Sequence, residues 1–173
     1  MTLPGLRGRS VHVIGPSGTE GSAVIDFLLG RGVTTITAHD LAANPEQFTE
    51  TFHRTHQWLE PEAREGALAR LLDSPVVIRY RDHYLTGIER ADLIVVPQSW
   101  FRHPENAPLR ALQERGVRFT SMTRLFLETC PCPIIGVTGT NGKFPVATLI
   151  YEMMRTAGRS VFFSGNDRTH VPM

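Results

Sequence analysis

The sequence predicts an α/β fold with a doubly wound, mostly parallel sheet. Short apolar runs, typical of buried strands, alternate with segments whose apolar residues recur at helical spacing. Two of these runs, at residues 11–14 and 134–137, are each followed by a Gly-rich turn and then by a helical pattern. A strand, a Gly-rich turn and a helix start together form an anion-binding unit, because backbone N–H groups and the positive end of the helix face the ligand.

Residues 11–40 predict a strand–turn–helix–strand unit. We expect the strand at 11–14, the turn at 15–21, the helix at 22–29 and a β-branched second strand at 33–38. Asp40 lies at the end of the second strand. Nucleotide-binding folds place a ribose-binding carboxylate near this point, whereas an ordinary turn or cap role accounts for such a residue about as often.

The middle of the chain continues the alternation. Helical patterns begin at Pro45 and Pro61. A clear buried strand is expected at 91–96, with further elements at 75–80 (strand), 104–115 (helix), 117–119 (strand) and 122–129 (helix). Cys130-Pro-Cys-Pro133 then breaks the pattern, and its closely spaced prolines suit a domain linker. We therefore expect a Rossmann-like domain over residues 1–131 and the start of a second domain over residues 132–173.

The second domain is expected to open with a β–phosphate-loop–α–β unit. We expect a strand at 134–137, then the loop, a helix at 145–157 and a strand at 160–163. The generic phosphate-loop motif places a Gly where this chain has Val137, so the generic spacing alone does not account for the loop.

Composition excludes some classes of function. The net charge is +1, which gives no electrostatic case for a nucleic acid or an anionic membrane as partner. No apolar run approaches the length of a membrane span, and the first residues lack the apolar core of a signal peptide. Cys130 and Cys132 are too close to form a structural staple, so we expect reduced thiols. These features predict a cytoplasmic protein.

The segment Gly136-Val-Thr-Gly-Thr-Asn-Gly-Lys143 resembles the ATP-binding signature of the Mur ligases, the ATP-dependent amide-bond-forming enzymes of peptidoglycan synthesis. The likeness continues through the strand at 91–96, His103-Pro104 and Arg124-Leu-Phe126, which together look like the branch of the family that adds D-glutamate. The resemblance implies that the phosphates of ATP are bound by Gly139, Thr140, Asn141, Gly142 and Lys143.

In that branch the first domain binds UDP-N-acetylmuramoyl-L-alanine. The resemblance implies that the Gly-rich turn after the first strand holds the pyrophosphate and that Asp40 faces the uridine. Ser164-Gly-Asn166 is similar to the family's Gly-Gly-Asn segment, whose Asn contacts the substrate. The implied UDP-substrate-binding residues are Ser17, Gly18, Thr19, Glu20, Asp40 and Asn166.

Phe144 departs from the family pattern, which has Ser or Thr after the lysine. That hydroxyl binds Mg²⁺, a hard cation that prefers oxygen ligands, and phenylalanine offers none. ATP and Mg²⁺ are the family's cofactors, but Mg²⁺ binding is put in doubt here and no metal site is expected. The sequence also stops before the family's Mg²⁺-binding Glu and His and its third domain. We therefore expect an incomplete ATPase domain that binds nucleotide without catalysis.

The parent reaction implied by the resemblance joins D-glutamate to the substrate carboxylate and turns ATP into ADP. One alternative is a non-catalytic Mur-like module that binds a uridine nucleotide or a partner. Another is a dinucleotide-dependent Rossmann enzyme, suggested by Gly15, Gly18 and Gly21, although their spacing differs from the usual motif. Apolar surface left uncovered by the missing part of the ATPase domain predicts a homodimer. His53-x-x-His56 has metal-pair spacing, but without a third ligand nearby a solvated helix face is the better interpretation.

Overall fold

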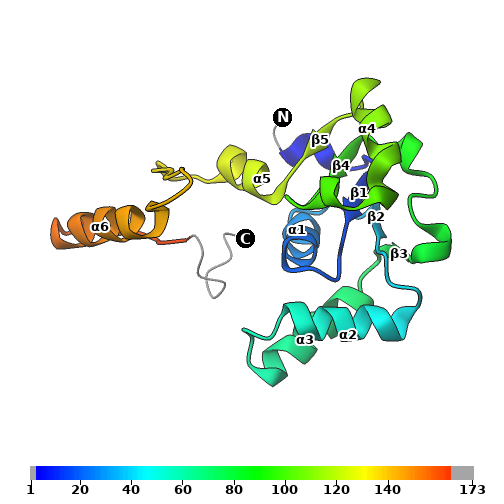
Figure 1. Cartoon of the computed structure of the whole chain (residues 1–173), viewed down its shortest axis with the longest axis horizontal. Coiled ribbons are helices and arrows are strands. Elements are labelled where there is room, and N and C mark those ends of the chain that lie inside the picture. Colours follow the sequence, from blue (N-terminus) through cyan, green and yellow to red (C-terminus); the bar gives the residue numbers. More distant parts are fainter. Residues whose placement is uncertain (1–2, 165–173) are drawn as a thin grey trace. The chain divides into compact units, whose positions relative to one another are not determined.

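A computed structural model describes residues 3–164. The chain forms two compact units, one up to Thr129 and one from Cys130 onward. The first unit is a sheet with helices on its faces, and the described part of the second is built around the helix α6 (Lys143–Thr156) (Figure 1). Within residues 3–164, every helix is too short or too polar to cross a membrane.

Five parallel strands form the sheet of the first unit, in the order β3-β2-β1-β4-β5. Val11 of the central strand lies opposite Ile36 on one side and Leu93 on the other. The strands are β1 (Val11–Ile14), β2 (Ile36–His39), β3 (Val77–Arg79), β4 (Leu93–Val95) and β5 (Phe119–Thr120). Because the chain first winds outward to β3 and then returns to place β4 beside β1, the sheet is doubly wound. The predicted fold class is confirmed, and the strand order reverses between β1 and β4.

Helices of the first unit begin where the sequence places helix-starting residues. Proline occupies the first turn of α2, α3 and α4, where its missing N–H costs nothing. The side chain of Asn44 accepts a hydrogen bond from the N–H of Gln47 and caps α2. The helices are α1 (Thr19–Gly30), α2 (Pro45–Thr55), α3 (Pro61–Leu72), α4 (Ala107–Glu114) and α5 (Met122–Thr129), with short 3-10 turns at Leu3–Leu6, Arg81–His83, Ile88–Arg90, Trp100–Arg102 and Pro104–Asn106.

The core lies on both faces of the sheet. Successive strand residues point to opposite faces, so Val13 and Ile14 of β1 belong to different apolar clusters. The larger cluster includes residues of α1, α2, α3 and α5, and the smaller one includes residues of α4. Phe48 and Phe52 of α2 are at most 1% exposed. Burial of each ring contributes about 1.5–3 kcal/mol, which fixes α2 against the larger cluster.

The second unit differs from the sequence prediction in its strands. Residues 134–137 and 160–163 were expected to be strands, but neither segment has strand pairing in the structure. Ile135 is 61% exposed and Phe162 is 67% exposed. A parallel strand exists only through hydrogen bonds to a neighbouring strand, and the described part of this unit supplies none. The helix was predicted correctly, although α6 begins at Lys143 rather than at Pro145.

Candidate functional site

The first candidate site is the turn between β1 and α1. Gly15 has a φ of 71°, a left-handed conformation that favours glycine. Gly18 ends the turn as the N-cap of α1. A Cβ added to Gly21 would overlap the carbonyl group of Gly15, so only glycine lets the helix approach the turn this closely. Gly15 and Gly21, both predicted to belong to this turn, therefore have local steric reasons to be glycine.

Asp40 ties the end of β2 to this turn. Its carboxylate accepts the N–H of Ser17 at 3.0 Å through Oδ2 and the N–H of Ala42 at 2.9 Å through Oδ1. The side chain is buried, with 4% of the residue exposed. This is the turn-stabilising role that the sequence left open beside ribose binding. Contact between Asp40 and a uridine stays a prediction.

Glu20 connects the start of α1 to the segment that follows β4. Its Oε2 accepts the N–H of Gln98 at 3.2 Å. The turns after β1 and β4 thus lie side by side where the strand order reverses. In open α/β sheets, ligands bind at this place, outside the carboxyl ends of the strands. The structure brings five predicted residues together here, namely Ser17, Gly18, Thr19, Glu20 and Asp40, whereas Asn166 lies outside the described residues.

The end of α2 also contacts the turn, which the sequence analysis did not anticipate. Thr55 Oγ1 donates to the carbonyl oxygen of Ser17 at 2.6 Å, and His56 Nε2 lies 2.9 Å from Ser22 Oγ. His56 is 4% exposed and stacks on Phe52, so its assignment to a solvated helix face was wrong. Burial lowers the pKa of His56, although its hydrogen bond to the carbonyl group of Phe52 raises it. The nearby charges of Arg64 and His53 lower it further.

His56 was missed because the helical spacing of two histidines carries no information about which one faces the core. His53 is half-buried, with its Nε2 3.0 Å from Glu65 Oε1 on α3. The useful signal was the amphipathic pattern of the helix. Phe48, Phe52 and His56 recur every fourth residue, and this spacing places them on one buried face.

The second candidate site is the loop before α6. Gly139 and Gly142 have positive φ values of 149° and 76°. Lys143 is the only lysine of the chain, and its Nζ donates to the carbonyl oxygens of Gly139 at 2.6 Å and Thr140 at 3.3 Å. The ammonium group therefore lies against the loop that it is predicted to serve. Thr140, Asn141 and Gly142 are exposed, as a phosphate site requires.

Phe144 occupies the position of the expected magnesium ligand and has an apolar neighbour instead. Its ring centroid lies 5.9 Å from that of Phe163, which in turn lies 5.5 Å from that of Tyr151. In the described part of the chain, His, Cys, Asp and Glu side chains form no cluster of three or more that could hold a metal ion. The residues at this loop do not fit a Mg²⁺ ion held by the usual hydroxyl group.

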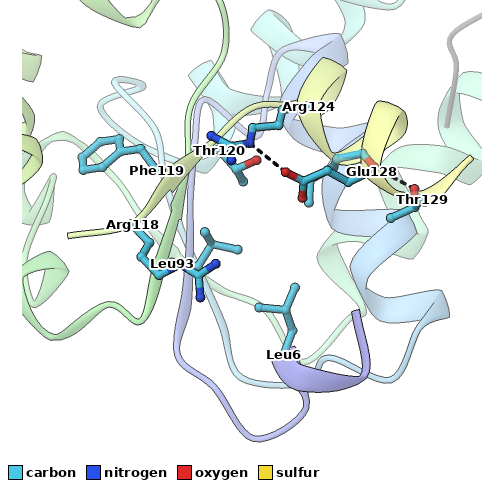
Figure 2. Close-up of a pocket in the computed structure, with 9 residues that line it drawn as sticks. Leu6, Leu93, Arg118, Phe119, Thr120, Arg124, Glu128 and Thr129 are labelled. Atoms are coloured by element: carbon cyan, nitrogen blue, oxygen red, sulfur yellow. Dashed lines mark hydrogen bonds and ion pairs between the residues drawn. The ribbon is translucent and has the colours of Figure 1, made fainter. Parts of the chain in front are cut away.

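The first unit also contains a cavity of about 240 Å³ that none of the predicted site residues lines. Figure 2 shows it between β4, β5, α5 and the N-terminal 3-10 turn, with apolar side chains from Leu6 and Leu93. At its rim, Arg124 Nε donates to Glu128 Oε1 at 2.8 Å, and this bond lowers the pKa of the Glu128 carboxyl group. The cavity is lined by residues other than those of the turn after β1.

Comparison with known proteins supports the resemblance seen in the sequence. The UDP-N-acetylmuramoylalanine–D-glutamate ligase of Desulfatibacillum aliphaticivorans is 32% identical over 163 residues, or 93% of this chain. The ligases of the same name from Symbiobacterium thermophilum and Escherichia coli K12 are 34% identical over 150 residues and 32% identical over 161 residues. The chain spans 28–31% of the length of these three relatives. No protein-family model matches it.

Proposed function

We propose that the first unit binds the uridine diphosphate part of UDP-N-acetylmuramoyl-L-alanine. The proposal starts from the membership of this chain in the Mur ligase family, as a homologue of the N-terminal region of UDP-N-acetylmuramoylalanine–D-glutamate ligases. One observation carries this proposal. The turn after β1 lies at the reversal of strand order and is held there by side chains from the ends of β2, α1 and α2. A turn fixed in this way presents its amide groups in a constant arrangement.

The start of α1 supplies the chemistry for a pyrophosphate. The first helical hydrogen bond joins the N–H of Ser22 to the carbonyl oxygen of Gly18, so the N–H groups of residues 19–21 have no partner within the helix. The helix dipole adds roughly half a positive charge at this end. Anionic oxygens placed over the turn would accept these N–H groups, and the sugar and uracil would extend toward the ends of β1 and β2.

For the second unit we propose ATP binding at the loop 136–143. Lys143 would exchange its bonds to the loop carbonyl oxygens for bonds to the outer phosphate oxygens. In a complete ligase, the substrate carboxylate takes the terminal phosphoryl group from ATP and releases ADP. The amine of D-glutamate then attacks the acyl phosphate and displaces phosphate as the amide forms. Because Phe144 provides no oxygen to a cation, we propose that these 173 residues bind nucleotide without catalysing that reaction.

Phe144 also favours a second candidate function, a Mur-like module that binds nucleotide and has no ligase activity in any context. A full-length ligase needs the metal to neutralise charge on the phosphates, and the aromatic ring at this position packs on Phe163 instead. Comparing the Mg²⁺ dependence of ATP binding in the wild type and in Phe144→Ser separates the two functions, because only a ligase segment needs to bind Mg²⁺ with Phe144 in place. Mg²⁺-dependent tightening of ATP binding in this variant, but not in the wild type, supports the module.

Calorimetry tests the nucleotide specificity of the first unit. We expect heat of binding from UDP-N-acetylmuramoyl-L-alanine and from UDP, and none from NADH. Binding of NADH in place of the uridine nucleotides would support the dinucleotide-dependent enzyme and overturn the proposal. Binding of none of the three would leave common ancestry without the proposed activity.

The single lysine allows a separate test of the second unit. A lysine-selective acylating reagent can modify only Lys143 and the amino terminus, and mass spectrometry distinguishes the two products. We expect ATP to slow acylation of Lys143 without changing that of the amino terminus. Equal rates with and without saturating ATP would contradict ATP binding at this loop. AMP, which keeps the adenosine of ATP and lacks the outer phosphates, is the matched control ligand.

A further inference from the structure

We infer that Thr55 and His56, at the end of α2, are positioning residues that fix the turn between β1 and α1 in the conformation that receives a nucleotide pyrophosphate. The inference rests on the proposed function, because it names what holds the proposed uridine-nucleotide site in place. Neither residue belongs to the turn itself, and both act through Ser17 and Ser22.

Ser17 is held by side chains on both of its peptide groups. Its N–H donates to Asp40, and its carbonyl oxygen accepts the hydroxyl hydrogen of Thr55 at 2.6 Å. The carbonyl of Ser17 shares a planar peptide unit with the N–H of Gly18, which donates to Gly15 across the turn. Thr55 therefore sets the orientation of the peptide that closes the turn and leads into the first N–H groups of α1.

Thr55 has a local alternative that its geometry does not favour. Threonine in a helix commonly donates to a carbonyl group in the preceding turn, and the carbonyl oxygen of Phe52 lies 3.1 Å from Thr55 Oγ1. The bond to Ser17, 38 residues earlier in the chain, is shorter at 2.6 Å. A hydroxyl group has one hydrogen to donate, and the shorter distance assigns it to the turn.

His56 holds the first turn of α1. Its Nδ1 lies 2.9 Å from the carbonyl oxygen of Phe52 and 3.0 Å from Thr55 Oγ1. A carbonyl oxygen can only accept, so this nitrogen carries the hydrogen, and Thr55 keeps its own hydrogen for Ser17. In the neutral ring Nε2 is then an acceptor. It lies 2.9 Å from Ser22 Oγ, closer than the carbonyl oxygens of Gly18 at 3.1 Å and Thr19 at 3.2 Å, so the hydroxyl group of Ser22 donates to it. Ser22 lies one turn inside α1. The contact therefore fixes the helix whose N-terminus is proposed to face the phosphates.

The buried face of α2 makes this arrangement stiff. Phe48 and Phe52 are buried in the larger cluster, and the imidazole of His56 stacks on Phe52 with ring centroids 3.8 Å apart. Thr55 and His56 thus project from a helix that is anchored by its own apolar side chains. A rigid support is what a preorganised binding turn needs, since ordering it on binding costs affinity.

The test compares Thr55→Val with two matched variants. Valine keeps the shape of threonine and removes the donor, Thr55→Ser keeps the donor, and Thr51→Val makes the same change one helical turn earlier, away from the binding turn. We expect Thr55→Val to weaken UDP binding about tenfold, as loss of one such hydrogen bond predicts. Thr55→Ser should restore affinity to within about threefold, and Thr51→Val should bind like the wild type. Equal UDP affinity of folded Thr55→Val and Thr51→Val would overturn the inference.

Amide hydrogen exchange without ligand separates this inference from the proposed function. We expect the Gly18 amide to exchange about tenfold faster in Thr55→Val than in Thr51→Val, at equal urea midpoints. If the wild type binds no UDP, the proposed function fails, while faster exchange at Gly18 still supports the positioning role. Unchanged exchange overturns that role whatever the ligand. If Thr55→Val does not fold, Ser22→Ala takes its place and removes the hydrogen bond to His56. Exchange of the Gly18 amide is then compared between Ser22→Ala and the control Ser10→Ala.

Discussion

Lowering the pH from 7 to 5 should destabilise the first unit, because two buried histidines share one hydrogen. His12 Nδ1 lies 2.8 Å from His39 Nε2, and both rings are buried within the sheet. His39 Nδ1 accepts the N–H of Leu85 at 3.1 Å, so the hydrogen of His39 is on Nε2 and is donated to His12. Both rings are therefore neutral in the folded state. Protonation of either one would place a donor against a donor.

The size of the effect follows from the pKa of His39. The pKa of His39 is lowered from 6.5 to about 3, mainly by burial and in smaller part by the neighbouring His12 and Arg79. Between these two values the unfolded chain binds more protons than the folded one, so stability falls as the pH falls. At 1.36 kcal/mol for each pH unit, the full window is worth on the order of 5 kcal/mol. The part lost between pH 7 and pH 5 is about 2 kcal/mol.

Urea unfolding followed by circular dichroism at pH 7 and pH 5 measures this loss. The window lies above the ordinary pKa of carboxyl groups, so they contribute little to it. His39→Asn keeps an acceptor for Leu85 and cannot titrate. We expect this variant to be less stable at pH 7 and to lose clearly less stability than the wild type on acidification. The reasoning is refuted if the wild type has the same free energy of unfolding at both pH values, or if His39→Asn shows the full wild-type loss.

Three further predictions concern the turn and the second unit. Gly21→Ala should destabilise the first unit by about 2 kcal/mol or more, as other overpacking changes do. The control is Gly30→Ala in the same helix, whose added methyl group meets nothing within 4 Å and should be neutral or slightly stabilising. Urea midpoints measure both changes in stability. Asp40→Asn should cost about 1–3 kcal/mol, since one of two backbone N–H groups loses its acceptor, and an unchanged midpoint would contradict this account. The exposed apolar side chains of α6 predict self-association, which Leu149→Glu should reduce. Sedimentation velocity measures it, and a wild type that is monomeric at all concentrations would exclude the predicted homodimer.

Local chemistry explains why the sequence predicted the first turn so well. A sharp turn and a close helix–strand approach leave room only for glycine, so Gly15 and Gly21 mark the turn without knowledge of the rest of the fold. The strands β1 and β4 are apolar apart from the buried His12 because both faces of the sheet are covered. These features depend on neighbours in sequence or on burial alone.

Two features could not be read from the sequence because they depend on partners distant in the chain. Residues 134–137 have the same apolar pattern as β1, yet a strand forms only beside another strand. Thr55 contacts a residue 38 positions earlier, and no periodicity encodes which hydroxyl group a helix end will present to a turn. The sequence therefore located the candidate sites but missed the residues that hold the first one in place.

Mapping of amide chemical shifts during a UDP titration tests the central claim most directly. The account predicts that the largest shifts fall on residues 15–21 and on the segment after β4, with residues of α6 unchanged. The Lys143 loop should respond to ATP and not to UDP. Shifts centred on the cavity around Leu6 and Arg124, or no shifts at all, would contradict a uridine-nucleotide site at the reversal of strand order.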